Sequence, residues 1–143
     1  DNGFVFYTNS KSKKGKAIKN NSSVALNFHW KTLQRQIRIE GDVSQISNIE
    51  ADEYYNSRPL GSKIGAWASL QSEELDDRST LIKRVEEFKK KFSNNDVPRP
   101  SYWNGYLVKP NLIEFWQEMS FRLHDRVEFK KEKENWVSRK LYP

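Results

Sequence analysis

The densest group of ionisable side chains is the segment Arg122-Leu123-His124-Asp125-Arg126. On a strand, Arg122, His124 and Arg126 would share one face, with Asp125 on the other. Two neighbouring guanidinium groups disfavour protonation of the imidazole, and a neutral imidazole beside two arginines suits an anionic ligand or a developing anion. The alternative is a surface strand with a local Asp–Arg ion pair.

The first 20 residues are strongly basic. They contain only one acid, Asp1, against the lysines Lys11, Lys13, Lys14, Lys16 and Lys19. This lysine cluster follows a predicted strand and opens a predicted helix, where free N–H groups and lysines bind phosphate well. A solvated basic helix is the alternative interpretation.

A second candidate phosphate site is the segment Arg58-Pro59-Leu60-Gly61-Ser62-Lys63 at a predicted helix boundary. The rigid fork of an arginine and the hydroxyl of a serine suit an anion, although an exposed turn would have the same residues. Trp116, just before the ionisable segment, either stacks on a planar ligand or fills the core.

Several kinds of chemistry are excluded or disfavoured. The chain has no cysteine, which removes thiolate chemistry and disulfides, and only two histidines, His29 and His124, without metal-binding spacing. No serine–histidine pairing, GxGxxG, P-loop or GxSxG motif occurs. The net charge of +6 admits phosphate-bearing partners. The residues alone therefore indicate a domain that binds something phosphorylated and aromatic.

The elements that must position these groups belong to one domain, since 143 residues fit a single core. Aromatic residues make up 13% of the chain, which argues against disorder. No apolar run approaches the roughly 18 residues of a membrane-spanning helix, and we expect no signal peptide. We therefore expect a cytoplasmic protein.

Strands are predicted near both ends and helices between them. Alternation and turn residues predict strands at 3–9, 23–30, 34–46, 106–109, 112–117, 126–130 and 136–141, with turns at Pro110-Asn111 and Glu134-Asn135. Gly41 indicates a bulge. Helices are predicted at 12–20, from Ser47 or Asn48 to about Asn56, and at 77–92; 62–70 is ambiguous and 93–100 is a loop. This order favours an α+β fold on an antiparallel sheet or small barrel.

A family resemblance covers essentially the whole chain, from Gly3 to Pro143. It rests on segments that occur in order: Tyr7-Thr8-Asn9, Arg35-Gln36, Ser57-Arg58-Pro59, Ser62-Lys63-Ile64-Gly65-Ala66-Trp67, Gln71-Ser72, Glu114-Phe115-Trp116-Gln117 and Arg122-Leu123-His124-Asp125-Arg126. Together they resemble the pyridoxamine 5′-phosphate oxidase family. The resemblance implies an FMN-binding split β-barrel, antiparallel and Greek-key-like with flanking helices, in a homodimer with FMN at the interface.

The resemblance also implies the activity. Such an enzyme oxidises pyridoxamine or pyridoxine 5′-phosphate to pyridoxal 5′-phosphate in vitamin B6 metabolism. FMN takes the hydride, and O2 reoxidises it to give H2O2; the amine substrate also releases ammonia. The implied partners are the phosphorylated substrate, O2 and a second copy of the chain, with no nucleic acid and no membrane.

Roles for individual residues follow from the resemblance alone. On one subunit, FMN would contact Tyr7, Thr8, Lys13, Lys14 and Gln36, with Lys13 and Lys14 on its phosphate. The partner subunit would add Gln71, Ser72, Trp116 and Arg126. The substrate phosphate would meet Tyr54, Arg58 and Ser62. Arg122 and His124 would approach the substrate ring opposite the flavin, as the catalytic pair, with Arg122 closest to the reacting carbon.

The chain departs from the family pattern at a few places. Ser12-Lys13-Lys14 stands where Ser-Arg-Lys is usual, Glu118 replaces a glycine, and the chain ends Lys140-Leu141-Tyr142-Pro143 in place of Arg-Leu-Ala-Pro. Family members also have an upstream strand pair, so we expect 1–143 to be a single domain lacking the N-terminal strands.

Two alternatives follow from these departures and from the net charge. A non-catalytic split-barrel protein that binds pyridoxal 5′-phosphate or flavin is the first, and a basic nucleic-acid-binding barrel is the second. The nucleic-acid-binding barrel predicts steep salt dependence of binding.

Overall fold

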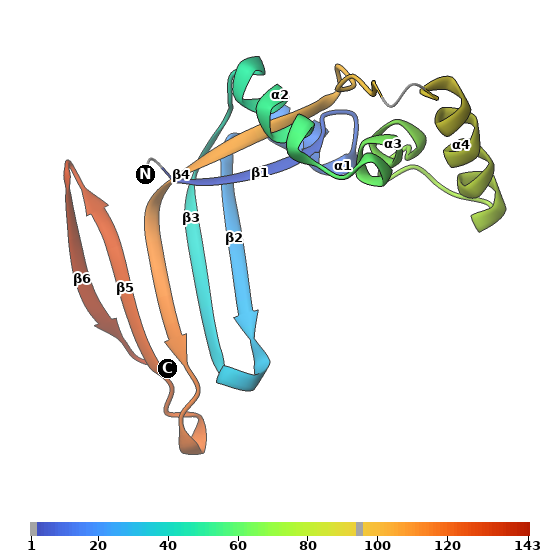
Figure 1. The fold of residues 1–143 in the computed structure, drawn as a ribbon. Helices are drawn as coiled ribbons and strands as arrows, with labels where there is room; N and C mark the ends of the chain where they lie inside the picture. Colours follow the sequence, from blue (N-terminus) through green and yellow to red (C-terminus); the bar gives the residue numbers. More distant parts are fainter. Residues whose placement is uncertain (1–2, 94–95) are drawn as a thin grey trace. The chain divides into compact units, whose positions relative to one another are not determined.

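The computed structural model describes residues 3–93 and 96–143 (Figure 1). Residues 94–95 of the predicted loop 93–100 therefore lie outside the described residues. The chain divides into two compact units. We call residues 3–4 with Asn21–Ser44 and Leu107–Pro143 the sheet unit, and Val5–Asn20 with Gln45–Tyr106 the helical unit.

The sheet unit consists of strands in the order β2-β3-β4-β5-β6. The strands are β2 (Ser23–Trp30), β3 (Arg35–Gln45), β4 (Trp103–Gln117), β5 (Asp125–Glu132) and β6 (Asn135–Leu141). Pairs β2–β3, β4–β5 and β5–β6 are antiparallel. The turn between β2 and β3 is a short 3-10 segment, Lys31–Leu33, that closes on the left-handed Gln34 (Figure 1). The alternating sequence predicted strand β2 correctly. The turn residues before Trp136 predicted the connection between β5 and β6 correctly.

The predicted turn at Pro110-Asn111 is wrong, because β4 continues without a break from Trp103 to Gln117. Proline has no N–H to donate, but its fixed φ is compatible with an extended strand. The register between β4 and β5 begins at Leu112, so the missing donor of Pro110 does not interrupt that ladder. One long strand therefore replaces the two short ones that were predicted.

The helical unit contains β1 (Phe4–Asn9), which pairs with β4, and the helices α1 (Lys13–Asn20), α2 (Asn48–Ser57), α3 (Leu60–Ala68) and α4 (Arg78–Lys91). Helix α2 begins with a capping box: Ser47 accepts from the Glu50 N–H, and the Glu50 carboxylate accepts from the Ser47 N–H. The ambiguous stretch 62–70 is mostly helix, because Trp67 of α3 packs against Phe88 and Phe92 at 5.8 and 5.4 Å. The α+β prediction is confirmed.

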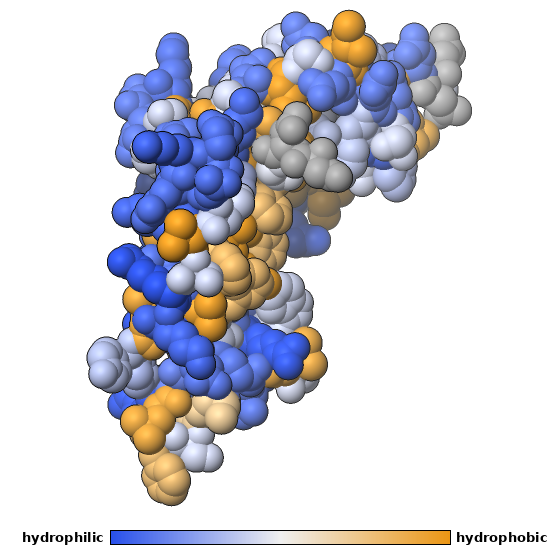
Figure 2. Space-filling model, turned by 90° about the vertical axis from the view of Figure 1, so that its left-hand side faces the viewer, coloured by the Kyte–Doolittle hydropathy of each residue, from blue (hydrophilic) through white to orange (hydrophobic). Residues whose placement is uncertain are grey.

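Each unit has its own small core. Ile39, Val43 and Val108 are buried in the sheet unit, and Ala51, Tyr55, Ile64 and Ala68 in the helical unit. Several large apolar side chains remain exposed, among them Phe28, Trp30 and Phe115 of the sheet unit. Figure 2 shows apolar residues scattered among hydrophilic ones on one face. In residues 3–93 and 96–143, no helix combines the length and apolarity needed to cross a membrane.

Gly41 is required by the close approach of two strands. The β2–β3 register runs unbroken through the pair Val24–Gly41, so that pairing has no bulge there. A Cβ on Gly41 would lie 2.1 Å from the carbonyl oxygen of Lys109 on β4, too close for any side chain. We expect Gly41→Ala to lower the free energy of unfolding by about 1–3 kcal/mol, because backbone must shift. Urea denaturation measures this change.

The matched control is Gly61→Ala in α3. A Cβ there meets no described atom within 4 Å. Alanine in a helix is more stable than glycine by roughly 0.5–1 kcal/mol, so we expect unchanged or slightly higher stability. Equal destabilisation by both substitutions would contradict the steric explanation for Gly41.

Candidate functional site

An aromatic stack in the helical unit brings together two predicted site residues. The rings of Tyr7 on β1 and Tyr54 on α2 are 3.9 Å apart and nearly parallel, and Tyr7 also stacks on Trp103 at 5.0 Å. Burial raises the pKa of Tyr7, and the neighbouring Tyr54 and Glu50 add to the shift. Burial also raises the pKa of Tyr55 to about 12. The phenols of Tyr7 and Tyr55 are therefore neutral hydrogen-bonding groups near neutral pH.

Arg58 ends helix α2 and lies against this stack. Its guanidinium carbon is 4.9 Å from the ring centre of Trp103 and 5.8 Å from that of Tyr55. Its Nη1 is buried and has no hydrogen-bond partner among the described residues. An unmet buried donor costs roughly 1–3 kcal/mol, so this guanidinium is well placed for an anionic acceptor.

The start of helix α3 adds further donors beside Arg58 in the chain. Its N-cap is Pro59, which supplies no side-chain hydrogen bond to the first turn, and Ser62 lies in that turn. Uncapped N–H groups at a helix start favour negative charge. Arg58 and the start of α3, with Ser62 in its first turn, are therefore candidate groups for binding a phosphate.

The end of β1 is connected to the loop after α3. The Gln71 side chain donates to the Thr8 hydroxyl and accepts from the Asn9 N–H, both at 3.2 Å. Ser72 follows with φ +72°, a left-handed conformation that is uncommon for a serine. One chain therefore brings Thr8 and Gln71 together, although the resemblance places them on different subunits.

Lys13 and Lys14 are the first two residues of helix α1. Buried Ser12 caps this helix: its hydroxyl donates to the Asn9 carbonyl at 2.6 Å and accepts from the Gly15 N–H at 3.2 Å. Cations at a helix N-terminus oppose the helix dipole, so these lysines do not stabilise α1 there. Their position suits a bound anion.

The face that Arg122, His124 and Arg126 would share on a strand does not form, although the strand predicted from Arg126 does. Ser120–Arg122 is a short 3-10 turn, and β5 begins only at Asp125. Phe121 and Arg122 have φ of +58° and +63°, two consecutive left-handed residues without a glycine. Such backbone strain is concentrated at functional sites. This turn breaks the alternation that the sequence suggested.

His124 contacts Trp116, with ring centres 4.7 Å apart. Its Nδ1 accepts a hydrogen bond from the Met119 N–H at 3.2 Å. A neutral His124 therefore carries its proton on Nε2, which leaves Nε2–H as the donor for a ligand. Arg126 instead pairs in register with Trp116 and binds Glu114.

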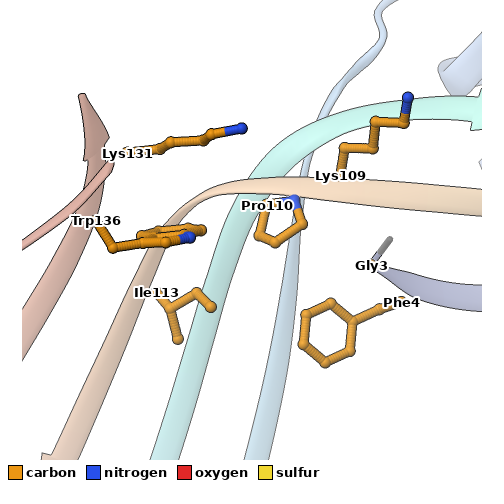
Figure 3. A pocket seen from close by; sticks show the side chains of 7 residues that line it. All are labelled: Gly3, Phe4, Lys109, Pro110, Ile113, Lys131 and Trp136. Atoms are coloured by element: carbon orange, nitrogen blue, oxygen red, sulfur yellow. The ribbon is translucent and has the colours of Figure 1, made fainter. Parts of the chain in front are cut away.

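The sheet unit contains several cavities, two of which differ in the predicted site residues that line them. The first, of about 540 Å³, is lined mainly by apolar groups such as Trp30, Leu33 and Phe115, together with the predicted FMN residues Gln36 and Trp116. The second, of about 710 Å³, contains Lys109, Lys131 and Trp136 and none of the predicted site residues (Figure 3). The first cavity fits part of a planar ligand.

Sequence reasoning gave no role to Trp103 or Glu114. Trp103 lies 45 positions beyond Arg58, and no pattern in one sequence indicates that contact. Glu114 had a signal, since it lies two residues from Trp116 on the same strand and so on the same face. Among the described residues, no group of three or more metal-ligating side chains is close enough to hold a metal.

Models of known protein families match most of the chain. Residues 1–92 match the family described as pyridoxamine 5′-phosphate oxidase. Residues 103–143 match the pyridoxine 5′-phosphate oxidase C-terminal dimerisation region. A pyridoxine/pyridoxamine 5′-phosphate oxidase of Granulibacter bethesdensis is 54% identical over all of this chain and 67% of its own length. One of Brucella anthropi is 52% identical over all of this chain and 71% of its own length.

Solved structures show the same fold. PhzG from Burkholderia lata, in complex with tetrahydrophenazine-1-carboxylic acid, has a TM-score of 0.90 at 30% identity, over 99% of this chain and 69% of that one. A pyridoxamine 5′-phosphate oxidase-related, FMN binding protein from Nostoc punctiforme has a TM-score of 0.73 at 12% identity, over 97% of this chain and 72% of that one. The predicted split β-barrel class is confirmed.

Proposed function

Because this chain belongs to the pyridoxamine 5′-phosphate oxidase family, we propose that it oxidises pyridoxamine or pyridoxine 5′-phosphate to pyridoxal 5′-phosphate. FMN is the proposed cofactor and O2 the final oxidant, giving H2O2. The observation that carries the substrate proposal is Arg58, whose buried Nη1 has no acceptor among the described residues. The substrate phosphate would accept from this atom.

Phosphate binding has two separate parts. Arg58, Ser62 and the uncapped α3 start would hold the substrate phosphate, with Tyr54 stacked on Tyr7 beside them. Lys13 and Lys14 at the α1 start would hold the FMN phosphate. Charge-assisted hydrogen bonds are roughly twice as strong as neutral ones, so both anchors favour phosphorylated ligands over their unphosphorylated forms.

The rest of the FMN site would come from Tyr7, Thr8 and Gln36, with Gln71, Ser72, Trp116 and Arg126. We propose a homodimer with FMN at the interface, in which both copies contribute residues of this set. The match of residues 103–143 to a dimerisation region supports this, because Trp116 and Arg126 lie within it. When bound, FMN supplies the acceptor for the hydride that leaves the substrate.

The side chains then have positioning and electrostatic roles. We propose that Arg122, in its left-handed turn, presents its charge to the substrate ring at the reacting carbon. His124 would donate from Nε2, because its Nδ1 already accepts from Met119. Holding reactants in a near-attack geometry contributes much of the rate in such reactions. No protein nucleophile is required.

Turnover by FMN-loaded protein tests this proposal. Incubation with pyridoxamine 5′-phosphate in air should form pyridoxal 5′-phosphate, with equal consumption of O2 and release of ammonia. Unphosphorylated pyridoxamine is the control and should react poorly. Tight binding of FMN or pyridoxal 5′-phosphate without turnover would support the non-catalytic alternative. Because a related protein was solved with tetrahydrophenazine-1-carboxylic acid, oxidation of that compound in preference to the phosphate ester would contradict the substrate assignment.

A further inference from the structure

An ion-pair network crosses four strands on one face of the sheet unit. Glu114 on β4 and Glu128 on β5 are direct cross-strand partners, and both are buried, with exposed fractions of 5% and 6%. Like charges directly opposite each other are destabilising unless cations compensate them. Arginines provide the compensation: Arg38 from β3 and Arg126 from β5 bind Glu114, and Arg139 from β6 binds Glu128.

Glu114 binds Arg126 through two parallel hydrogen bonds. Arg126 Nε donates to Oε1 at 2.9 Å, and Nη2 donates to Oε2 at 3.1 Å. Arg38 Nη2 adds a longer contact to Oε2 at 3.4 Å. The hydrogen bond from Arg126 lowers the pKa of Glu114 despite the opposing effect of burial. Glu114 is therefore an ionised carboxylate that fixes the plane of the Arg126 guanidinium.

Arg126 retains donors for a ligand. Its Nη1 donates to the Tyr142 carbonyl at 3.0 Å. With the two bonds to Glu114, three of the five guanidinium N–H bonds thus have acceptors among the described residues. Two N–H bonds remain. Arg126 is also the register partner of Trp116, so both side chains lie on the same face as Glu114.

We propose that Glu114 is a positioning residue for FMN: it holds the Arg126 guanidinium in the orientation in which its remaining donors meet the flavin. This inference rests on the proposed function, in which Arg126 contacts FMN. Glu114 itself does not touch the cofactor. An arginine on a flexible stem loses side-chain entropy on binding, and a preformed two-point ion pair removes part of that loss beforehand.

The network contains a matched control. Glu128 has the same buried setting and binds its own arginine, Arg139, at 2.6–2.7 Å. Arg139 is not among the residues proposed to bind FMN. A purely structural role would make Glu114 and Glu128 equivalent for FMN, whereas the positioning role makes only Glu114 matter.

The test compares Glu114→Gln with Glu128→Gln in the full chain. Titration of the apoprotein with FMN, followed by quenching of flavin fluorescence, gives Kd for each variant. We expect Glu114→Gln to weaken FMN binding about 10- to 100-fold, by analogy with the loss of the hydrogen-bond partner behind a metal-binding side chain. Glu128→Gln should keep the Kd close to that of the unaltered protein, even though both variants lose stability in urea.

A double-mutant cycle with Arg126→Met separates positioning from general disturbance. If Glu114 acts through Arg126, Glu114→Gln should weaken FMN binding no further once Arg126 is methionine. A further loss in that background, or equal FMN affinity of Glu114→Gln and Glu128→Gln, would overturn the inference.

Two more outcomes complete the experiment. Should Glu114→Gln not fold, Glu114→Asp keeps the charge but moves the carboxylate back, and we expect weaker FMN binding with the ion pair retained. Unchanged affinity in that variant would count against positioning. Failure of the unaltered protein to bind FMN would overturn the proposed function, whereas tight binding that ignores Glu114 would overturn only this inference.

Discussion

Replacement of Arg122 by alanine is expected to lower kcat about 100- to 1,000-fold while FMN stays bound. Removal of one charged donor aimed at a reacting centre typically has this effect. Arg122 lies in the strained turn before β5, exposed and outside the ion-pair network of the sheet. Its loss should therefore change the chemistry more than cofactor retention. Steady-state kinetics with pyridoxamine 5′-phosphate and the FMN Kd together measure this division.

Phe121 supplies the control for this prediction. It has the same left-handed backbone as Arg122 and a side chain that is 93% exposed. Phe121→Ala therefore changes the turn to a similar extent without removing a charge, and kcat should stay near its original value. A comparable fall in kcat for both variants would mean that the shape of the turn matters and the guanidinium does not.

Replacement of Arg58 by alanine is expected to raise KM for the phosphorylated substrate about 10- to 100-fold, with the FMN Kd unchanged. A hydrogen bond to a charged group contributes roughly 1.5–3 kcal/mol, and each 1.4 kcal/mol is tenfold in affinity. Among the described residues, the Arg58 Nη1 has no hydrogen-bond acceptor. Its removal therefore breaks no hydrogen bond of Nη1 within the protein, and the effect on KM comes from the lost bond to the substrate. Initial rates over a wide substrate range, with flavin content determined by absorbance, check the prediction.

Arg99 is the matched control for Arg58, because its hydrogen bonds are made within the protein. It binds Asp52 at 2.6 Å and the Trp103 carbonyl at 2.8 Å. Arg99→Ala should lower stability and leave KM near its original value, whereas Arg58→Ala should do the reverse. If Arg58→Ala and Arg122→Ala lost flavin equally, the separate assignment of phosphate binding and catalysis would be wrong.

Local sequence patterns predicted most elements of the fold. Alternation in β2, the helix start at Ser47 or Asn48 before α2 and the turn before β6 are short-range signals, and each element formed where expected. Two predictions that depended on context were wrong. Pro110 was read as a turn inside β4, and the face that Arg122, His124 and Arg126 would share on a strand does not form. Backbone conformation at such positions depends on packing that neighbours in sequence do not reveal.

The sequence by itself determined the family and the α+β class, and it supplied the residues that we propose for the two phosphate anchors. It did so because motif order and hydrophobic periodicity are properties of the chain alone. Only the tertiary structure decided the contacts: Arg58 on Trp103, Gln71 on Thr8, and Glu114 on Arg126. Such contacts join residues that lie 12 to 63 positions apart in the sequence. These residues meet because of strand register and side-chain direction, and no local sequence pattern records either of them.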